Sequence, residues 1–493
     1  MDRAPADAAS RSARARDADP RGPAHPATRR AVNAARYDTT RVAVGAERSV
    51  LDESDQLDDR VVAMIRGRLA ILLLLTGLNL VNYIDRAVVA AVLTPMKAEL
   101  GLSNLEAGIL NTAFLIGYFL FCPLFGMRAD KGPRKGLIAL GVVIWSLATV
   151  ASGLATGFWT LLAARVVVGV GEASYAVLAP TIIDDVTPAD RKGTALSVFY
   201  LAIPIGYSLG YILGGALAQH WGWRAAFYAV GGPGVVLALS CLLIVEPPRK
   251  LLDAKAKLFD GLRVLAAIPL FRRAVLGYIA YTAAAAGFSF WAVDFLLRAY
   301  PNELNVETAN RYFGMVLIVA GGIGIVVGGR YTNRVGRHHP IAPHHEYDSP
   351  VNKRAINSLL RICAIGMAVA APVSAVGFFV PGATAFFVIS FVVDVGLFAS
   401  TAPVNAAFLR SVPVERRASA MAASILAIHL FGDLWSAAAL GLLLDNLPLK
   451  IAMLALPLTF AWSAYIWRPR KREAEPSLPA EGSLPEARVH TST

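Results

Sequence analysis

Residues 188–203 read PADRKGTALSVFYLAI, and residues 413–428 read PVERRASAMAASILAI. Both stretches begin with proline, carry two adjacent basic residues and run into an apolar segment that ends in LAI. The second stretch begins 413 − 188 = 225 residues after the first. Self-similarity of this kind indicates that the chain contains two related halves.

A second pair of similar stretches supports the repeat. GMRADKGPRK begins at Gly126, and GRYTNRVGRH begins at Gly329, which is 329 − 126 = 203 residues later. The two offsets differ by 225 − 203 = 22 residues, and the second half has a longer loop, RHHPIAPHHEYDSPVNK, between its two stretches. The repeat therefore predicts the same order of helices and loops in both halves.

Long apolar segments dominate the chain. Of its 493 residues, 56% are hydrophobic and 17% are charged, against about 25% charged in a typical soluble domain. A helix needs about 20 apolar residues to cross a bilayer. Segments of this length recur at residues 69–95, 104–127, 134–156, 158–186, 191–219, 223–245, 272–299, 308–332, 354–378, 381–409, 415–444 and 448–467. The sequence therefore predicts an all-α membrane protein with twelve transmembrane helices in two six-helix halves.

The basic residues lie mainly in alternate gaps between these segments. They gather in the arginine-rich N-terminal tail and at residues 128–135, 189–193, 247–273, 333–339, 414–417 and 468–472. Because basic loops stay in the cytoplasm, this pattern predicts that both termini are cytoplasmic. The net charge of +12 is thus assigned to membrane topology, and no nucleic-acid partner is expected.

The chain is expected to have five parts. Residues 1–66 and 468–493 are polar and poor in large apolar residues, which predicts disordered cytosolic tails. Residues 67–246 and 272–467 are expected to form the two six-helix bundles, and residues 247–271 the cytosolic linker between them. The three cysteines show no disulfide or metal-binding spacing.

Two such halves joined by a cytosolic linker are similar to the parallel repeat of major facilitator transporters. GMRADKGPRK resembles the loop signature of that family, with proline at position 133 where glycine is usual. The resemblance implies a gating loop that holds the two halves together. Its candidate residues are Gly126, Asp130, Lys131 and Arg134, with Arg334 and Arg337 in the second copy. The alternative is a basic loop that only anchors the topology.

Charged residues interrupt the first and fourth apolar segments. Asp85 and Arg86 interrupt NLVNYIDRAVVAAVL (79–93), and Arg165 and Glu172 lie in the fourth segment. Each charge at the centre of a span costs about 2.5–3.5 kcal/mol on insertion scales, so such residues usually have a function. Arg165 and Glu172 are two helical turns apart and share one face, with glycines at 169 and 171 between them. Adjacent residues point about 100° apart, so Asp85 and Arg86 are expected to address different neighbours.

Proton coupling is the chemistry expected of these four residues. Burial favours the neutral form of a carboxyl group, and a nearby arginine favours the charged form. A movement that changes this balance loads or releases a proton. Glu172 is the expected carrier, with Asp85 titrating alongside it. The alternative is a static salt-bridge network that only fixes helix packing.

Several stretches resemble the Spinster family of sphingolipid and lysolipid transporters. They are NYIDR (82–86), GVGEASYAVLAPTIIDD (169–185), LSVFYLAIPIGYSLGYILGG (196–215), FWAVDFLLR (290–298) and HLFGD (429–433). The resemblance covers about residues 69–445. It implies that Asp85, Arg86 and Glu172 couple protons and that the substrate is an amphipathic lipid with a polar or phosphate head. Asp294 departs from the pattern, which leads one to expect a small apolar residue there.

A substrate cavity is expected among aromatic and polar residues of the spans. Its candidates are Tyr83, Tyr118, Tyr175, Tyr200, Tyr211, Trp291, Asp294, His429 and Asp433. Each aromatic residue can instead serve helix packing. His429 and Asp433 are four residues apart and should face one another. Gly206 to Gly215 resemble an antiporter motif, with Tyr211 in place of proline, or form a close-packing glycine stripe.

The sequence thus predicts a proton-coupled secondary transporter that works by alternating access and moves lysolipid or sphingosine-phosphate-like amphiphiles. A multidrug or organic-anion carrier is the first alternative, and a non-transporting lipid sensor is the second. No enzyme motif, nucleotide-binding loop or cofactor is expected, and the proton gradient is the energy source. Zinc binding by His338, His339, His344 and His345 is disfavoured, because no scaffold is apparent. A monomer in a bacterial inner membrane is expected.

Overall fold

The computed structural model describes residues 67–129, 132–188, 191–246, 265–339, 348–413 and 416–469. Apart from residues 468 and 469, the predicted tails lie outside these residues, and so does most of the predicted linker. By contacts the chain divides into two units between Leu69 and Ala70. All the contacts below belong to the second unit, Ala70–Thr493.

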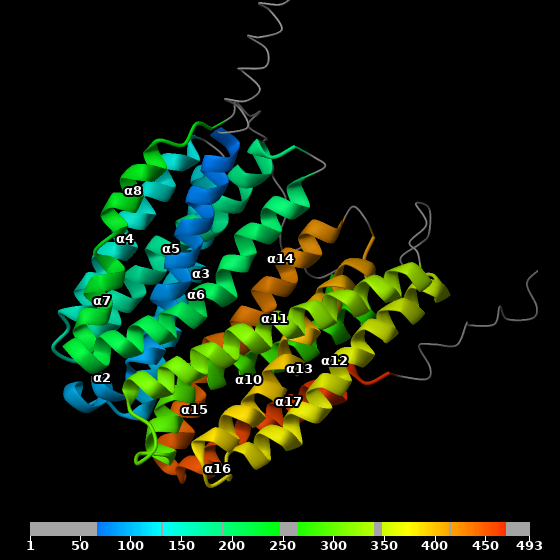
Figure 1. The fold of residues 1–493 in the computed structure, drawn as a ribbon. Coiled ribbons are helices and arrows are strands. Elements are labelled where there is room, and N and C mark those ends of the chain that lie inside the picture. The colour runs from blue at the N-terminus through cyan, green and yellow to red at the C-terminus, as the bar shows by residue number, and fades with distance from the viewer. Residues whose placement is uncertain are drawn as a thin grey trace, which may run out of the picture. The chain divides into compact units, whose positions relative to one another are not determined.

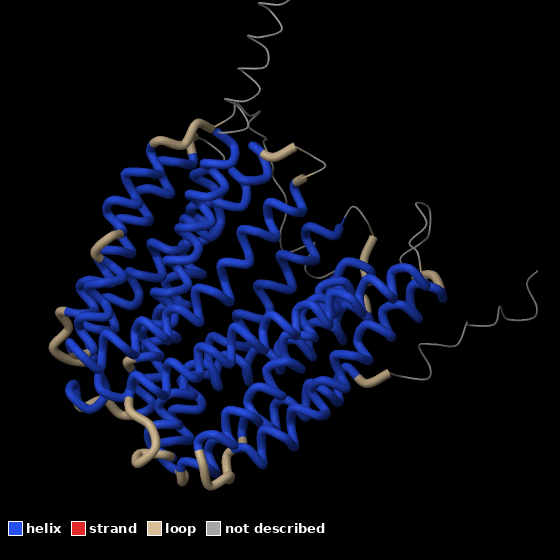
Figure 2. The backbone as a smooth tube through the Cα atoms, in the orientation of Figure 1, coloured by secondary structure: helices blue, strands red, loops and turns tan. Residues whose placement is uncertain are grey.

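Helices account for nearly all of the described residues, and Figure 2 shows them as the blue part of the backbone. The first half begins with a helix over Gly67–Ala91, which we call the first helix. It continues with α2 (Leu93–Leu100), α3 (Asn104–Ala129), α4 (Arg134–Gly153), α5 (Phe158–Val186), α6 (Lys192–Trp221), α7 (Trp223–Gly231) and α8 (Gly234–Leu242).

The second half has the corresponding helices (Figure 1). They are α10 (Pro269–Ala299), α11 (Val306–His338), α12 (Pro350–Gly377), α13 (Ala383–Arg410), α14 (Arg417–Ile428), η2 (His429–Asp433), α15 (Leu434–Asn446), α16 (Leu449–Met453) and α17 (Ala455–Trp467). Within the ranges given above, twelve helical segments are long and apolar enough to cross a membrane. The predicted number of spans is therefore confirmed.

The two halves repeat the same helix packing. In the first half α5 packs against α3 and α4, and in the second half α13 packs against α11 and α12. The halves contact each other mainly through α3 with α15 and through α6 with α11. This symmetry confirms the fold class predicted from the internal repeat.

The two ends of the bundle differ in how the halves meet. We call the helix ends near residues 129–134, 186–192 and 410–417 the basic end, and the opposite helix ends the closed end. Figure 1 shows the helices of the two halves diverging toward the basic end. At the closed end hydrogen bonds join the halves, such as Asn310 Nδ2 to the carbonyl of Ala91 at 2.9 Å.

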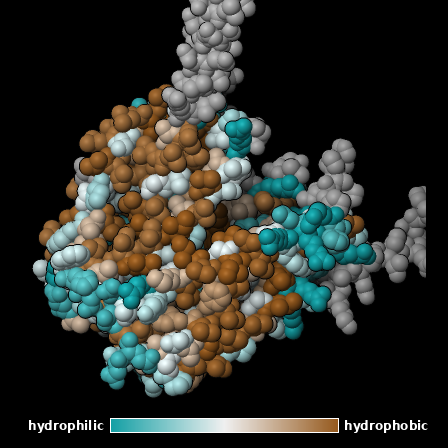
Figure 3. All heavy atoms as spheres, in the orientation of Figure 1, coloured by the Kyte–Doolittle hydropathy of each residue, from teal (hydrophilic) through white to brown (hydrophobic). Residues whose placement is uncertain are grey.

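The outer surface matches a bilayer environment. Leu120, Leu243, Val388 and Leu458 are among many large apolar side chains that are more than half exposed. Figure 3 shows apolar residues over most of the visible helical surface, with hydrophilic residues gathered near helix ends. Such an exposed apolar surface is compatible with lipid contact and not with water. The chain is thus a multi-pass integral membrane protein.

A salt-bridge network joins helix ends of the first half at the basic end. The buried side chain of Arg134 contacts Asp185 Oδ2 at 2.6 Å and Glu246 Oε2 at 3.2 Å. Burial opposes ionisation of Glu246. However, hydrogen bonds from the backbone and side chain of Arg134 and from the backbone of Lys135 lower the pKa of this carboxyl. The ionised Glu246 side chain therefore stabilises the folded protein fully above the unfolded-state pKa of about 4.3. This stabilisation is lost as pH falls through the lower folded-state pKa.

We expect Glu246→Gln to lower the melting temperature at neutral pH and to have less and less effect as pH falls through the lowered folded-state pKa of Glu246, below which the wild-type carboxyl is also protonated. Melting curves of the purified protein in detergent, recorded for both forms between neutral and acidic pH, measure this difference. A difference in melting temperature that stays constant across the pH range would contradict the role given to the Glu246 charge.

Candidate functional site

A buried ion pair joins the first helix to α5. Arg86 Nε lies 2.7 Å from Glu172 Oε2, and their side chains are 14% and 0% exposed. Glu172 lies in the middle of a 29-residue helix, far from either helix end and from water. A carboxylate in such a place needs a cationic partner, and Arg86 provides it.

Asp85 makes a different set of contacts from its neighbour Arg86. Its Oδ2 accepts a hydrogen bond of 2.6 Å from Thr149 Oγ1 on α4, and its carboxyl is buried. The adjacent residues thus contact α4 and α5 separately, as the 100° turn per residue predicts. Asp85 and Glu172 also lie close enough to interact electrostatically with Arg165. The four predicted charged residues therefore form one buried cluster.

Glycine makes room for this cluster on α5. A Cβ atom at residue 169 would lie 2.0 Å from the carbonyl oxygen of Phe114 on α3. A Cβ atom at residue 171 would lie 2.5 Å from the backbone nitrogen of Trp145 on α4. Both distances are below van der Waals contact, so only glycine allows α3 and α4 to approach α5 this closely. The close packing expected from Gly169 and Gly171 is confirmed.

Aromatic rings surround the two arginines. The Arg86 guanidinium carbon lies 5.0 Å from the ring centres of Tyr83 and Phe114 and 5.1 Å from that of Tyr118. Arg165 lies 5.1 Å from the Phe114 ring centre. Within the described part of the chain, Nε and one terminal nitrogen of buried Arg165 have no hydrogen-bond partner. Arg165 thus retains unused donors beside an aromatic wall, where an anion would be bound strongly.

A cavity of about 270 Å³ lies between the two halves beside this cluster. Arg86 and Arg165 lie on its first-half wall, and His429 and Asp433 lie on its second-half wall. The remaining lining residues are Tyr83, Ala90, Asn111, Phe114, Leu115, Tyr207, Tyr211, Ala286, Ser289 and Phe290. The cavity is therefore basic on one side, with a histidine–aspartate pair on the other and aromatic rings between.

His429 and Asp433 belong to η2, a short π-helix that interrupts the eleventh span between α14 and α15. His429 Nδ1 lies 2.7 Å from Asp433 Oδ2, which confirms that the two side chains face one another. The His429 ring also approaches the Phe119 ring of the first half at 5.5 Å. Single π-helical turns occur frequently at functional sites. The sequence analysis did not predict this one.

The other predicted cavity residues lie in different places. Tyr118 contacts Arg86 but is not among the lining residues. Tyr175 is buried in the first-half core and donates a hydrogen bond to the carbonyl of Leu75. Tyr200 is 49% exposed on α6. Trp291 is fully buried and donates a 3.0 Å hydrogen bond to the carbonyl of Ala437. Of the nine predicted cavity residues, the structure places Tyr83, Tyr211, His429 and Asp433 on the cavity wall.

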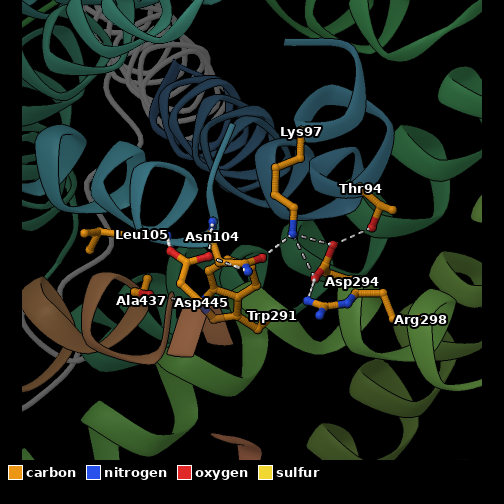
Figure 4. Close-up of polar contacts among 9 residues, drawn as sticks. All are labelled: Thr94, Lys97, Asn104, Leu105, Trp291, Asp294, Arg298, Ala437 and Asp445. Atoms are coloured by element: carbon orange, nitrogen blue, oxygen red, sulfur yellow. Dashed lines mark hydrogen bonds and ion pairs between the residues drawn. The ribbon is translucent and has the colours of Figure 1, made fainter. Parts of the chain in front are cut away.

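Asp294 lies at the closed end and not among the lining residues of the cavity. Its Oδ1 is 3.1 Å from Lys97 Nζ of α2, and it accepts a 2.9 Å hydrogen bond from Thr94. Figure 4 shows these contacts, together with Arg298 on the next turn of α10. The charges that interrupt the seventh span thus make an ion pair between the halves.

Asp445 of α15 extends this set of contacts to α3. Its two carboxylate oxygens accept hydrogen bonds of 3.0 and 2.8 Å from the backbone N–H groups of Asn104 and Leu105 (Figure 4). These are free N–H groups at the first turn of α3, so a carboxylate of the second half caps a helix of the first. We call Thr94, Lys97, Asn104, Asp294 and Asp445 the closed-end cluster.

The predicted gating-loop residues that the structure describes lie apart from one another. Arg134 binds within the first half, as described above, and Gly126 packs loosely against Val177. Arg334 and Arg337 are exposed near the end of α11. Asp130 and Lys131 lie outside the described residues, so the predicted contacts of Asp130 stay a prediction.

The cavity wall includes residues that the sequence analysis missed. Tyr207 is one helical turn from Tyr211 on α6, and this spacing could have identified it. Tyr211 donates a hydrogen bond to the carbonyl of Ser289 on α10. Asn111 and Ser289 had no distinguishing pattern. Within the described ranges, no group of three or more histidine, cysteine and acidic side chains could hold a metal ion.

A family profile for the Major Facilitator Superfamily matches residues 75–432. The fold and its cavity between two halves are those of a transporter of this superfamily. Human protein spinster homolog 1 is 32% identical over 413 residues, which cover 79% of this chain and 75% of that protein. The chain belongs to the Spinster family of the major facilitator superfamily.

Two further comparisons agree with this assignment. The Arabidopsis thaliana protein described as probable sphingolipid transporter spinster homolog 2 is 29% identical over 428 residues, covering 79% of this chain and 84% of that protein. The crystal structure of a bacterial homolog to the human lysosomal transporter Spinster, inward-facing and occupied, superposes with a TM-score of 0.69. It is 24% identical and covers 80% of this chain and 95% of its own. A D-xylose–proton symporter has the same fold, with a TM-score of 0.65 at 16% identity, and covers 82% of this chain and 99% of its own.

Proposed function

We propose that this protein is a proton-coupled secondary transporter that moves single-chain amphipathic lipids with an anionic head, such as lysophospholipids or sphingosine-phosphate-like molecules. The observation that carries the proposal is the buried Arg86–Glu172 ion pair at the wall of the cavity between the halves. It places an ionisable acid and the binding cavity in contact with the same arginine.

Glu172 and the anionic head of the substrate compete for Arg86, and this competition couples proton binding to substrate binding. While Glu172 is charged, Arg86 is paired with it. When Glu172 takes up a proton, the attraction is lost and Arg86 is released to the cavity, where an anionic head can bind it. Because both events use the same guanidinium, substrate and proton affect each other's binding, and this reciprocity is required of coupled transport. Asp85 stays beside Arg165 and forms the second carboxyl of the same cluster.

The cavity fits the head of an amphiphile better than a whole lipid. Its volume of about 270 Å³ is slightly below the roughly 300–1,000 Å³ range of pockets that enclose drug-sized ligands. Two arginines and His429 complement a phosphate group, and the aromatic rings accommodate the adjoining carbons. The A. thaliana relative is described as a probable sphingolipid transporter, which agrees with this substrate class.

The basic end is proposed to face the cytoplasm of a bacterial cell and the closed end the opposite side of its inner membrane, following the positive-inside rule. The contacts at the closed end then correspond to a state open toward the cytoplasm. Alternating access requires these contacts to break and the basic end to close. The protein is proposed to do this as a monomer, without a cofactor.

Reconstitution into liposomes tests the proposal. Labelled lysophospholipid and sphingoid phosphate are followed across the membrane with and without an imposed pH gradient. We expect saturable flux that increases with the gradient. Gradient-driven flux of organic anions or drugs without lipid flux would favour the organic-anion or multidrug carrier. Saturable lipid binding without net flux of any compound would favour the non-transporting sensor.

A further inference from the structure

A second, larger hollow lies in the second half, away from the central cavity. It has a volume of about 590 Å³ and lies between α10, α17 and η2. Its principal walls are Arg272, Leu276 and Ile279 of α10, Trp462 and Tyr465 of α17, and Phe431 of η2. We call it the α10–α17 groove.

The groove has the length and lining of a binding site for an acyl chain. Its α10 residues run from Pro269 to Ala283 at intervals of three or four, so they form one stripe of about 21 Å along the helix. That length exceeds the ~15 Å half-thickness of a hydrocarbon core. Phe431 and Trp462 are 66% and 60% exposed on membrane-spanning segments, which places an open apolar surface against the bilayer.

The basic end of the same groove is built for an anion. α10 begins at Pro269, so the positive end of its helix dipole lies at this end. Arg272 is exposed at the rim. Arg273 also lines the groove although it is only 4% exposed, and it donates a hydrogen bond to Asn357 Oδ1 on α12. A helix N-terminus and an exposed arginine thus lie at the end of the groove where a lipid headgroup would lie.

Aromatic side chains indicate that this end of the groove lies at the depth of the lipid headgroups. Trp462 and Tyr465 stack with ring centres 5.6 Å apart and an angle of 17° between the rings. Arg468 covers the Tyr465 ring at 4.0 Å. Tryptophan and tyrosine favour the boundary between headgroups and hydrocarbon, and Arg468 adds positive charge on the side facing the headgroups.

From these observations we propose that the α10–α17 groove binds one bilayer phospholipid with an anionic headgroup. The phosphate lies at Arg272 and the first turn of α10, and an acyl chain lies along the apolar stripe. The occupant is a resident lipid of the leaflet at the basic end and not the transported molecule. Phe431 belongs to the same π-helical turn as His429 and Asp433 of the central cavity, so the lipid contacts the outer side of that wall.

Fluorescence quenching by brominated lipids tests this site. The protein is reconstituted in phosphatidylcholine vesicles that contain increasing fractions of brominated phosphatidylglycerol or brominated phosphatidylcholine. The Trp462 signal is the difference between each protein and its Trp462→Phe counterpart. We expect half of this signal to be quenched at a fraction of brominated phosphatidylglycerol about fivefold lower than the fraction of brominated phosphatidylcholine that has the same effect. Attraction between an anionic headgroup and one arginine near the surface contributes about 1 kcal/mol, which corresponds to this ratio.

Matched variants distinguish lipid binding in the groove from a general effect of surface charge. Arg272→Gln should abolish the preference for phosphatidylglycerol. Arg354→Gln should retain it, because Arg354 is also exposed near the start of a helix with proline at its first turn but does not line the groove. Ala283→Phe, which fills the apolar end, should reduce quenching by both lipids.

Four results would overturn the proposal. The first three are equal quenching by the two brominated lipids in the wild type, a preference that survives Arg272→Gln, and relief of quenching by inorganic phosphate. Relief of quenching by unlabelled lysolipid at the concentration that half-saturates flux would assign the groove to the transported molecule and would also overturn it. Because the readout is binding, the proposal can fail or hold independently of the proposed transport function.

Discussion

In the Glu172→Gln variant, lipid flux driven by a pH gradient should fall at least about tenfold and should no longer respond to the gradient. Glutamine keeps the size of the side chain but cannot carry a proton or pair as an ion with Arg86. Removing one partner of a buried ion pair costs about 3–5 kcal/mol, and each 1.4 kcal/mol changes a population about tenfold. The measurement is initial flux into proteoliposomes at several gradients.

Asp184→Asn is the matched control for this prediction. Asp184 lies twelve residues further along α5, but its side chain is 46% exposed and pairs with Lys192 at the surface. Exposed ion pairs contribute about 0–1 kcal/mol, so flux should remain close to that of the wild type. Gradient-driven flux that persists unchanged in Glu172→Gln would show that another group carries the proton.

The fold could be predicted because its determinants are local. Membrane thickness fixes the length of each apolar segment, and the repeat requires no long-range contact to be recognised. The charged cluster could also be predicted, since an acid such as Glu172 inside an apolar helix requires a partner. Helical geometry then separated the directions of Asp85 and Arg86 correctly.

The position of Asp294 shows what the sequence could not determine. Its charge indicated a special role, but the cavity and the closed end both contain polar residues of α10. Asp294 is five residues from Ala299, where α10 ends, and this depth favours the closed end. Its partner Lys97 is 197 residues away, and no local pattern connects the two. The capping of α3 by Asp445 spans 341 residues and was equally inaccessible.

The closed-end cluster should control the equilibrium between the two transport states. Lys97→Met removes the cation beside Asp294, whose side chain is only 1% exposed. Losing one partner of such a pair costs about 3–5 kcal/mol, and Arg298 at 3.3 Å compensates part of it. We therefore expect the fraction of molecules in which the closed end is open to be at least about tenfold larger in Lys97→Met than in the wild type. Flux should fall, because every cycle requires this end to close again.

Distances between spin labels at Leu154 and Phe379 measure this opening. Both residues are exposed, near the closed ends of α4 and α12, and Cys122 is replaced to avoid unwanted labelling. Lys353→Met, which breaks an exposed ion pair with Asp348, should leave the distances unchanged. The double variant Lys97→Met/Asp294→Asn should open less than Lys97→Met alone, because it leaves no buried charge unpaired. Distances that are the same in the wild type and Lys97→Met would contradict the role of the cluster.

Raising the pH should produce the same opening without a mutation. Burial lowers the pKa of Lys97, although Asp294 acts in the opposite direction. The lysine therefore loses its proton at a lower pH than a free lysine, whose pKa is about 10.4, and Asp294 then loses its cationic partner on α2. In the wild type the long-distance population should grow as pH rises toward that value. In Lys97→Met it should already be large and should not change, since the group that titrates is absent.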